Sequence, residues 1–222
     1  MFPEASEADQ VMIVVPTGYE VGALLVTVTA EQLSEVIGVP KTNPVATQPE
    51  LVVALTAAGA AIAGVDAVMK GEVENVFCAV RPPGHHAEPT RSMGFCLFDN
   101  VAIAARYAMA TYGIERVAII DFDVHHGNGT EDIVAGDDRI LMVSFYQHPF
   151  YPDGGALKHD TNLVNLPVPA YTKGMDIREL IEMIWIPRLE AHRPEMIFIS
   201  AGFDAHREDD MGQLGLVEQD YV

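Results

Sequence analysis

The 222-residue sequence is poor in cysteine, and this shortage excludes two kinds of stabilised scaffold. Its two cysteines, Cys78 and Cys96, stand in separate segments and form no C-x-x-C pair. A disulfide framework and a cysteine-based zinc knuckle are therefore both excluded. We expect the two thiols to be reduced and buried.

Basic residues are also scarce, because 13 Lys and Arg stand against 32 Asp and Glu and leave a formal net charge of −19. This charge repels phosphate backbones, so no direct nucleic-acid partner is expected. The acidity either keeps the protein soluble or attracts basic substrates over long range, and composition does not choose between these two roles.

Targeting and membrane signals are missing as well. The segment Met1–Gln10 carries three acidic residues and no basic one, unlike the start of a secretory signal, so we predict a cytoplasmic protein. The longest uncharged run, Leu51–Val65, is shorter than the roughly 20 apolar residues that a bilayer span needs. It predicts a helix packed on a sheet and no membrane partner.

The sequence does contain an alternation of strand-like and helix-like segments. Its 49% hydrophobic and 20% charged residues are typical of a folded protein, and its length fits one domain over residues 1–222. Apolar runs predict strands at Val11–Val15, Ala23–Val28, Val76–Val80, Val117–Ile120, Ile140–Phe145 and Met196–Ser200. Helical patterns cover Pro49–Lys70, Asn100–Tyr112 and Ile177–Ala191. This order predicts an α/β fold with a mostly parallel sheet flanked by helices.

Local signals mark the ends of the predicted helices. Side-chain oxygens that can cap helix starts come from Asp99, Asn100 and Asp176. Gly71 and Gly113 stand where the first two helices should stop. Pro187 should kink or interrupt the third helix.

Polar side chains follow three of the predicted strands, at the end where α/β sheets gather their ligands. The three polar segments are Arg81–His86 (RPPGHH), Asp121–Asn128 (DFDVHHGN) and Ala201–His206 (AGFDAH). Strand alternation places Asp121, Asp123 and His125 on one face, with the residues between them on the other. A carboxylate and an imidazole two residues apart, joined by a carboxylate from a neighbouring strand end, can hold Zn²⁺ and leave positions open. We therefore predict Asp123, His125 and Asp204 as zinc ligands.

A plain structural alternative is that these acids cap helices and that the histidines satisfy buried backbone groups. That explanation suffices for any single residue. For the three segments together it fails, because burying so many ionisable groups costs on the order of several kcal/mol unless a metal or mutual pairing compensates.

Four segments resemble the zinc-dependent histone deacetylases and the related bacterial acetylpolyamine amidohydrolases, in particular the class II branch. In the family's order they are Arg81–Ala87, Met93–Asn100, Asp121–Thr130 and Ala201–His206. The resemblance covers about residues 75–216, whereas residues 1–49 diverge from the family. It implies a three-layer arginase/deacetylase-type fold, zinc on Asp123, His125 and Asp204, and acetylated lysine peptides or acetylated polyamines as substrates.

The resemblance also implies catalytic roles for a tandem histidine pair. His85 and His86 would be hydrogen-bonded to Asp121 and Asn128 respectively, with His86 as the general base. An ionised Asp favours a protonated ring, whereas a neutral Asn only orients it, so we expect His85 to hold its proton more tightly. Zinc would activate water, and neutral His86 would accept the proton.

A substrate tunnel and a second ion are implied in the same way. Residues expected to line a narrow acyl-lysine tunnel are Gly94 and Phe95, with Phe150 or Tyr151 opposite. A K⁺ site beneath the zinc would use Asp121 and the hydroxyl of Ser144. Ordinary hydrogen bonding at the end of a strand also explains Ser144.

Two features depart from the family pattern. The family's Gly-Gly-Tyr loop, whose tyrosine stabilises the oxyanion, does not follow Asp204, and Gly154–Gly155 precedes Ala156 instead. We therefore expect a fold that is incomplete at its C-terminus and that lacks a donor typically worth about 10²–10³ in kcat. Tyr146 stands where many members have histidine.

These departures leave alternatives to a working amidohydrolase. One is a truncated, catalytically weak module that binds zinc and acetyl-lysine. An arginase-like manganese hydrolase is disfavoured because it needs more ligands for two metals. The natural substrate, the choice of zinc or iron, and the oligomeric state, including a homo-oligomer, stay open.

Overall fold

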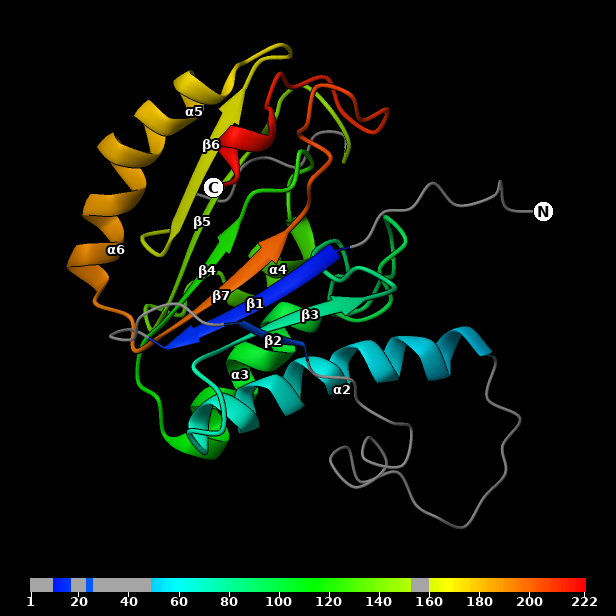
Figure 1. The fold of residues 1–222 in the computed structure, drawn as a ribbon, viewed down its shortest axis with the longest axis vertical. Helices are drawn as coiled ribbons and strands as arrows, with labels where there is room; N and C mark the ends of the chain where they lie inside the picture. Colours follow the sequence, from blue (N-terminus) through cyan, green and yellow to red (C-terminus); the bar gives the residue numbers. More distant parts are fainter. Residues whose placement is uncertain (1–9, 17–22, 26–48, 153–159) are drawn as a thin grey trace.

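The computed structural model describes residues 10–16, 23–25, 49–152 and 160–222, which form a sheet with helices on both faces (Figure 1). Its strands are β1 (Gln10–Pro16), β2 (Ala23–Leu25), β3 (Asn75–Val80), β4 (Val117–Asp121), β5 (Ile140–Gln147), β6 (Leu163–Val168) and β7 (Met196–Ala201). Its helices are α2 (Pro49–Met69), α3 (Asn100–Tyr112), α4 (Asn128–Val134), α5 (Gly174–Leu180), a π-helical segment η1 (Ile181–Trp185), α6 (Ile186–His192) and a short 3₁₀ turn η2 (Glu218–Asp220). Predictions for residues 1–9, 26–28 and 154–156 lie outside the described residues.

The seven strands form one sheet in the order β2-β3-β1-β7-β4-β5-β6. β1 runs antiparallel to both of its neighbours, β3 and β7, while the remaining pairs are parallel. The prediction of a mostly parallel sheet is confirmed, with β1 as the exception. The carboxyl ends of β3, β4 and β7 consequently lie at the same edge of the sheet.

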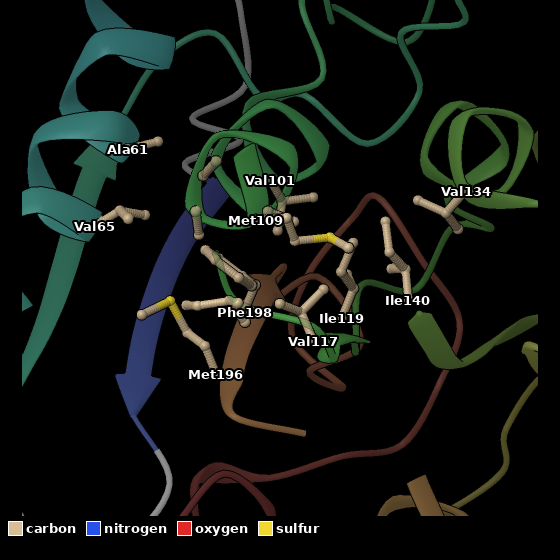
Figure 2. Packing of buried hydrophobic residues seen from close by; sticks show 14 of the residues in the cluster. Ala61, Val65, Val101, Met109, Val117, Ile119, Val134, Ile140, Met196 and Phe198 are labelled. Atoms are coloured by element: carbon tan, nitrogen blue, oxygen red, sulfur yellow. The ribbon is translucent and has the colours of Figure 1, made fainter. Parts of the chain in front are cut away.

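Strand β5 is buried on both of its faces. Ile140 and Met142 pack into a core cluster that also contains residues of α2, α3 and α4 (Figure 2). Leu141 and Val143 pack into a second cluster with residues of α5 and η1. A strand covered on both sides reads as a continuous apolar run, which is why β5 was predictable.

Helix α2 shows why a long apolar helix can belong to a core. Over Val52–Met69 it is long and apolar enough to cross a membrane by length and composition alone, although more than half of that stretch is buried inside the protein. Ala61 and Val65 pack directly into the first cluster (Figure 2). The prediction of a helix packed on the sheet is confirmed.

The predicted ends of the first two helices are confirmed at the level of hydrogen bonds. Gly71 and Gly113 both adopt left-handed backbone angles, with φ of 70° at each position. The N–H of Gly113 donates to the carbonyl of Met109, and Asp99 caps the start of α3 by accepting from the N–H of Ala102. Asn100 does not cap α3, and its side chain instead donates to the carbonyl of Pro82 in the loop after β3.

The third predicted helix is divided where Pro187 falls. α5 continues into η1, in which the N–H of Ile186 donates to the carbonyl of Ile181, five residues back. Pro187 lacks an N–H and is tolerated in the first turn of the next segment, α6, so the interruption is confirmed. Asp176 was predicted to cap a helix that begins at Ile177, but α5 begins earlier, at Gly174, and Asp176 lies inside its first turn, where its carboxylate accepts from the N–H of Lys173.

Candidate metal centre

Three side chains converge at the carboxyl edge of the sheet. Asp123 and His125 follow β4, and Asp204 follows the paired strand β7. Nδ1 of His125 lies 2.9 Å from Oδ1 of Asp123 and 3.0 Å from Oδ2 of Asp204. One ligand atom from each residue lies within 4.8 Å of the other two, so the predicted ligand set is brought together.

The donor set fits a zinc ion. Carboxylate oxygens and imidazole nitrogens are ligands that Zn²⁺ takes in proteins, at about 2.0–2.2 Å from the ion. Two carboxylates and one imidazole leave at least one position for water or substrate. Among the described residues this is the one cluster of at least three such side chains.

Backbone contacts hold the ligands in place. Oδ1 of Asp204 accepts from the N–H of Val124 at 2.9 Å, which leaves Oδ2 to face His125. Gly202 lets the Asp123 carboxylate approach β7, because a Cβ at this position would lie 2.1 Å from Oδ2 of Asp123. The alternation predicted beyond β4 is also present, since Val124 packs into the second core cluster on the other side.

The charges at the site favour a cation between the carboxylates. Burial alone would lower the pKa of His125, but hydrogen bonds and charge from Asp123 and Asp204 outweigh it and raise the pKa to about 10. Burial and the neighbouring Asp123 raise the pKa of Asp204 to about 6. Burial alone would raise the pKa of Asp123, but His85 and His125 outweigh it and hold the pKa of Asp123 below its ordinary value.

The tandem histidines lie against this cluster with the partners that were predicted. Nδ1 of His85 is 2.9 Å from Oδ2 of Asp121, and Nδ1 of His86 is 2.8 Å from Oδ1 of Asn128. Burial opposes protonation of His85, but Asp123 and Asp121 raise its pKa to about 9. Burial and the charge of His85 lower the pKa of His86 to about 2. The two rings therefore differ in the direction that the Asp and Asn partners predicted.

Aromatic side chains stand over two of the imidazoles in the site. Phe150 stacks on His125 with ring centroids 5.4 Å apart, and Tyr151 meets His86 edge-on at 5.1 Å. A Cβ on Gly94 would lie 2.2 Å from Cδ2 of His86, so only glycine allows this approach. Phe95 follows Gly94 with a φ of 62° and is 64% exposed. The tunnel-lining role of these four residues stays a prediction.

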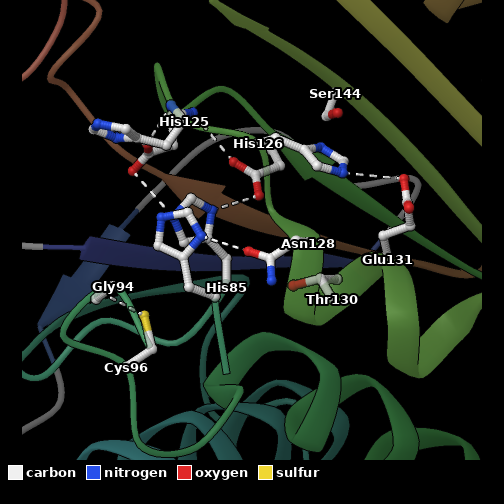
Figure 3. Close-up of polar contacts among 12 residues, drawn as sticks. His85, Gly94, Cys96, His125, His126, Asn128, Thr130, Glu131 and Ser144 are labelled. Atoms are coloured by element: carbon white, nitrogen blue, oxygen red, sulfur yellow. Dashed lines mark hydrogen bonds and ion pairs between the residues drawn. The ribbon is translucent and has the colours of Figure 1, made fainter. Parts of the chain in front are cut away.

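The region beneath the metal ligands contains the residues predicted for K⁺. Ser144 on β5 pairs in register with Asp121 on β4, and its hydroxyl donates to Oδ1 of Asn165 at 3.2 Å. Nearby, the rings of Tyr146 and His126 are tilted against each other with centroids 4.4 Å apart, and Nε2 of His126 lies 3.2 Å from Oε2 of Glu131 (Figure 3). The hydroxyl of Ser144 already has Asn165 as its partner without an ion. The K⁺ site therefore stays a prediction.

Two residues that reasoning from sequence did not single out complete the histidine environment. Nδ2 of Asn128 donates to Oε1 of Glu88 at 2.9 Å and lies 3.3 Å from the sulfur of Met93. Met93 begins one of the segments that resemble the family, and Glu88 directly follows another.

Comparisons with known proteins point to one family. The family model described as the histone deacetylase domain matches residues 23–222. The chain is 40% identical to the histone deacetylase-like amidohydrolase of Pseudomonas aeruginosa, over 74% of this chain and 45% of that protein. It is 42% identical to histone deacetylase 14, chloroplastic, of Arabidopsis thaliana, over 75% of this chain and 42% of that protein.

A solved structure agrees as well. The crystal structure of the HDA15 HD domain matches with a TM-score of 0.71 and 36% identity, over 76% of this chain and 52% of that one. The chain thus spans less than half of each of these two curated relatives and about half of the solved domain. With the fold, the ligand cluster and the family model in agreement, the chain belongs to the histone deacetylase family.

Proposed function

We propose that this chain provides the metal centre of a zinc-dependent amidohydrolase that removes acetyl groups from acetyl-lysine or acetylated polyamines. The observation that carries the proposal is the convergence of Asp123, His125 and Asp204 beside a buried histidine pair with unlike partners. A purely structural ion pair would not need two adjacent buried imidazoles, one held by a carboxylate and the other by an amide.

Bound at these ligands, zinc supplies Lewis acidity that activates water and polarises the acetyl carbonyl. His86 is the group suited to accept the proton from water, because its neighbours keep it neutral and Asn128 orients its ring. His85, held protonated beside Asp121, adds positive charge next to the ring of His86. Phe150 covers the ring of His125, and Tyr151 covers the ring of His86.

The reaction balances as a hydrolysis. Water adds to the acetyl carbon, the C–N bond of the amide breaks, and acetate and a free amine leave. The proton taken up by the histidine pair returns to the departing nitrogen. Two free, buried cysteines fit the reducing, cytoplasmic location that we propose for the chain.

The test is a deacetylation assay on an acetyl-lysine peptide and on an acetylated polyamine, after chelation and after return of Zn²⁺, Fe²⁺ or Mn²⁺. We expect turnover of at least one substrate that is lost on chelation and restored by zinc. Stoichiometric zinc binding without turnover of either substrate would instead support a module that binds metal and acetyl-lysine. Turnover that survives complete metal removal would contradict the proposal.

A further inference from the structure

The side chain of Asn128 makes contacts on both sides of its amide group. Its Oδ1 lies 2.8 Å from Nδ1 of His86. Its Nδ2 lies 2.9 Å from Oε1 of Glu88 and 3.3 Å from the sulfur of Met93. Asn128 therefore connects a histidine in the site with a carboxylate at its margin.

The contacts on the Nδ2 side determine which way the amide points. An ionised carboxylate and a thioether can only accept hydrogen bonds. An amide turned the other way would place its own carbonyl against these two acceptors. The NH₂ group of Asn128 must consequently face Glu88 and Met93, and its carbonyl must face His86.

The orientation of the amide in turn fixes the proton on the imidazole. A carbonyl oxygen has no hydrogen to give, so the hydrogen bond to Asn128 requires a hydrogen on Nδ1 of His86. Nε2 is then the ring nitrogen that remains free to accept a proton. The choice between the two neutral tautomers is thus made by the group on the far side of the asparagine.

Glu88 is itself held in position. Nη2 of Arg91 lies 2.8 Å from its Oε1 and Nε lies 3.1 Å from its Oε2, a bidentate pair. The backbones of the two residues also exchange hydrogen bonds at 3.0 and 3.3 Å. The Arg91 guanidinium keeps the pKa of Glu88 below its ordinary value, so the carboxylate stays an acceptor.

We propose that Glu88 is a positioning residue that, through Asn128, fixes the hydrogen of His86 on Nδ1 and leaves Nε2 as the proton acceptor. His85 needs no such relay, because the Asp121 carboxylate contacts its Nδ1 directly. The catalytic role of this tautomer rests on the function proposed above. The position of the hydrogen on the ring follows from the contacts alone.

The first test reads the tautomer by ¹⁵N NMR of the histidine rings in the full chain, with and without added Zn²⁺. The His86 signals are identified by their loss in a His86→Gln variant. We expect Nδ1 to carry the hydrogen in the wild type and in Glu88→Gln, which keeps an acceptor oxygen. Glu88→Lys presents only donors, so the amide should turn and the hydrogen should move to Nε2.

The second test compares kinetics in the same variants. We expect Glu88→Ala to lower kcat by about 10- to 100-fold, the usual effect of losing a supporting partner, with a KM change below about twofold. Glu88→Lys should lower kcat at least as much, and Glu88→Gln should stay within about threefold of the wild type. Glu115→Ala is the matched control, since Glu115 also pairs with an arginine on the surface but lies at the opposite end of β4.

The two tests separate this inference from the proposed function. A hydrogen that stays on Nδ1 in Glu88→Lys would overturn the inference, as would an unchanged kcat in Glu88→Ala of an active enzyme. If the wild type turns over no acetylated substrate but the tautomer follows residue 88, the proposed function fails and the positioning role stands. Thermal melting of each variant shows whether it is folded.

Discussion

At the scale of single residues, we expect metal binding to depend on the negative charge of Asp204. Its two carboxylate oxygens do different things, because Oδ1 holds the backbone of Val124 while Oδ2 faces Nδ1 of His125. Asp204→Asn keeps a carbonyl oxygen for Val124 but removes the negative charge from the ligand set. The substitution thus separates the structural role from the metal-binding role.

We predict that Asp204→Asn remains folded and no longer binds one equivalent of zinc, because the site would retain only one carboxylate and one imidazole. Metal analysis after dialysis and calorimetric titration with Zn²⁺ measure the loss. Glu208→Gln, an exposed change on the same loop, should bind zinc as the wild type does. Full zinc retention by Asp204→Asn would exclude Asp204 as a ligand.

The two histidines of the pair should respond unequally to substitution. His86 carries the proton transfer in the proposed mechanism, so His86→Ala should lower kcat by about 10²–10⁴-fold. His85→Ala should cost less, because it removes a charge and leaves the base in place. Steady-state assays of both variants at one zinc concentration decide the order, and equal or reversed losses would contradict these roles.

At the scale of elements, the contribution of a helix end to the free energy of unfolding can be measured with a single substitution. Gly113 ends α3 at a φ of 70°, and a Cβ added there would meet no atom within 4 Å. Gly113→Ala should destabilise the fold by about 1 kcal/mol through backbone strain alone, measured as the free energy of unfolding in urea. Gly215→Ala is the control, because its φ is not in the left-handed range and its nearest contact is an ordinary 3.4 Å. Equal effects of the two changes would argue against a conformational cause.

Elements with strong local signals were predictable from the sequence, and those set by tertiary context were not. α3 begins and ends at the predicted residues because Asp99 and Gly113 supply both caps. β6 was missed because Pro167 interrupts its apolar run, and the structure tolerates this proline because β6 lies at the edge of the sheet. The direction of β1 has no local signal, since only its pairing with β3 and β7 makes it antiparallel.

The same division applies to the site. Asp123, His125 and Asp204 could be predicted because each follows an apolar strand, and strand ends gather at one edge. α4 was missed because its first residues, Asn128 and Gly129, resemble a loop. Glu88 was not singled out because its contact with Asn128 joins residues 40 apart in the sequence, which no local pattern encodes.

At the scale of the whole molecule, ion pairs between elements make stability depend on pH. Asp137, in the turn before β5, contacts Arg139 and Arg106, and these arginines hold its pKa below its ordinary value despite partial burial. A lowered folded-state pKa means that the unfolded chain binds more protons, so this stabilisation is present above about pH 4 and is lost as the pH falls further. Asp137→Asn should therefore be less stable than the wild type at pH 7, and the difference should shrink below about pH 4. Urea unfolding across pH measures it, and a difference that stays constant with pH would contradict an electrostatic cause.

The net charge of −19 belongs to no single element, and its effect is testable only in the complete chain. If the acidity attracts basic substrates, the kcat/KM for an acetyl-lysine peptide flanked by arginines should fall as NaCl rises from about 0.01 to 0.15 M, because the Debye length shortens from about 30 to 8 Å. A peptide of the same length with neutral flanks should change little over this range. A parallel fall for both peptides would mean that salt acts on the enzyme itself, and no fall for either would leave solubility as the role of the charge. We expect the difference between the peptides to appear in KM, since steering changes encounter and not the chemical step.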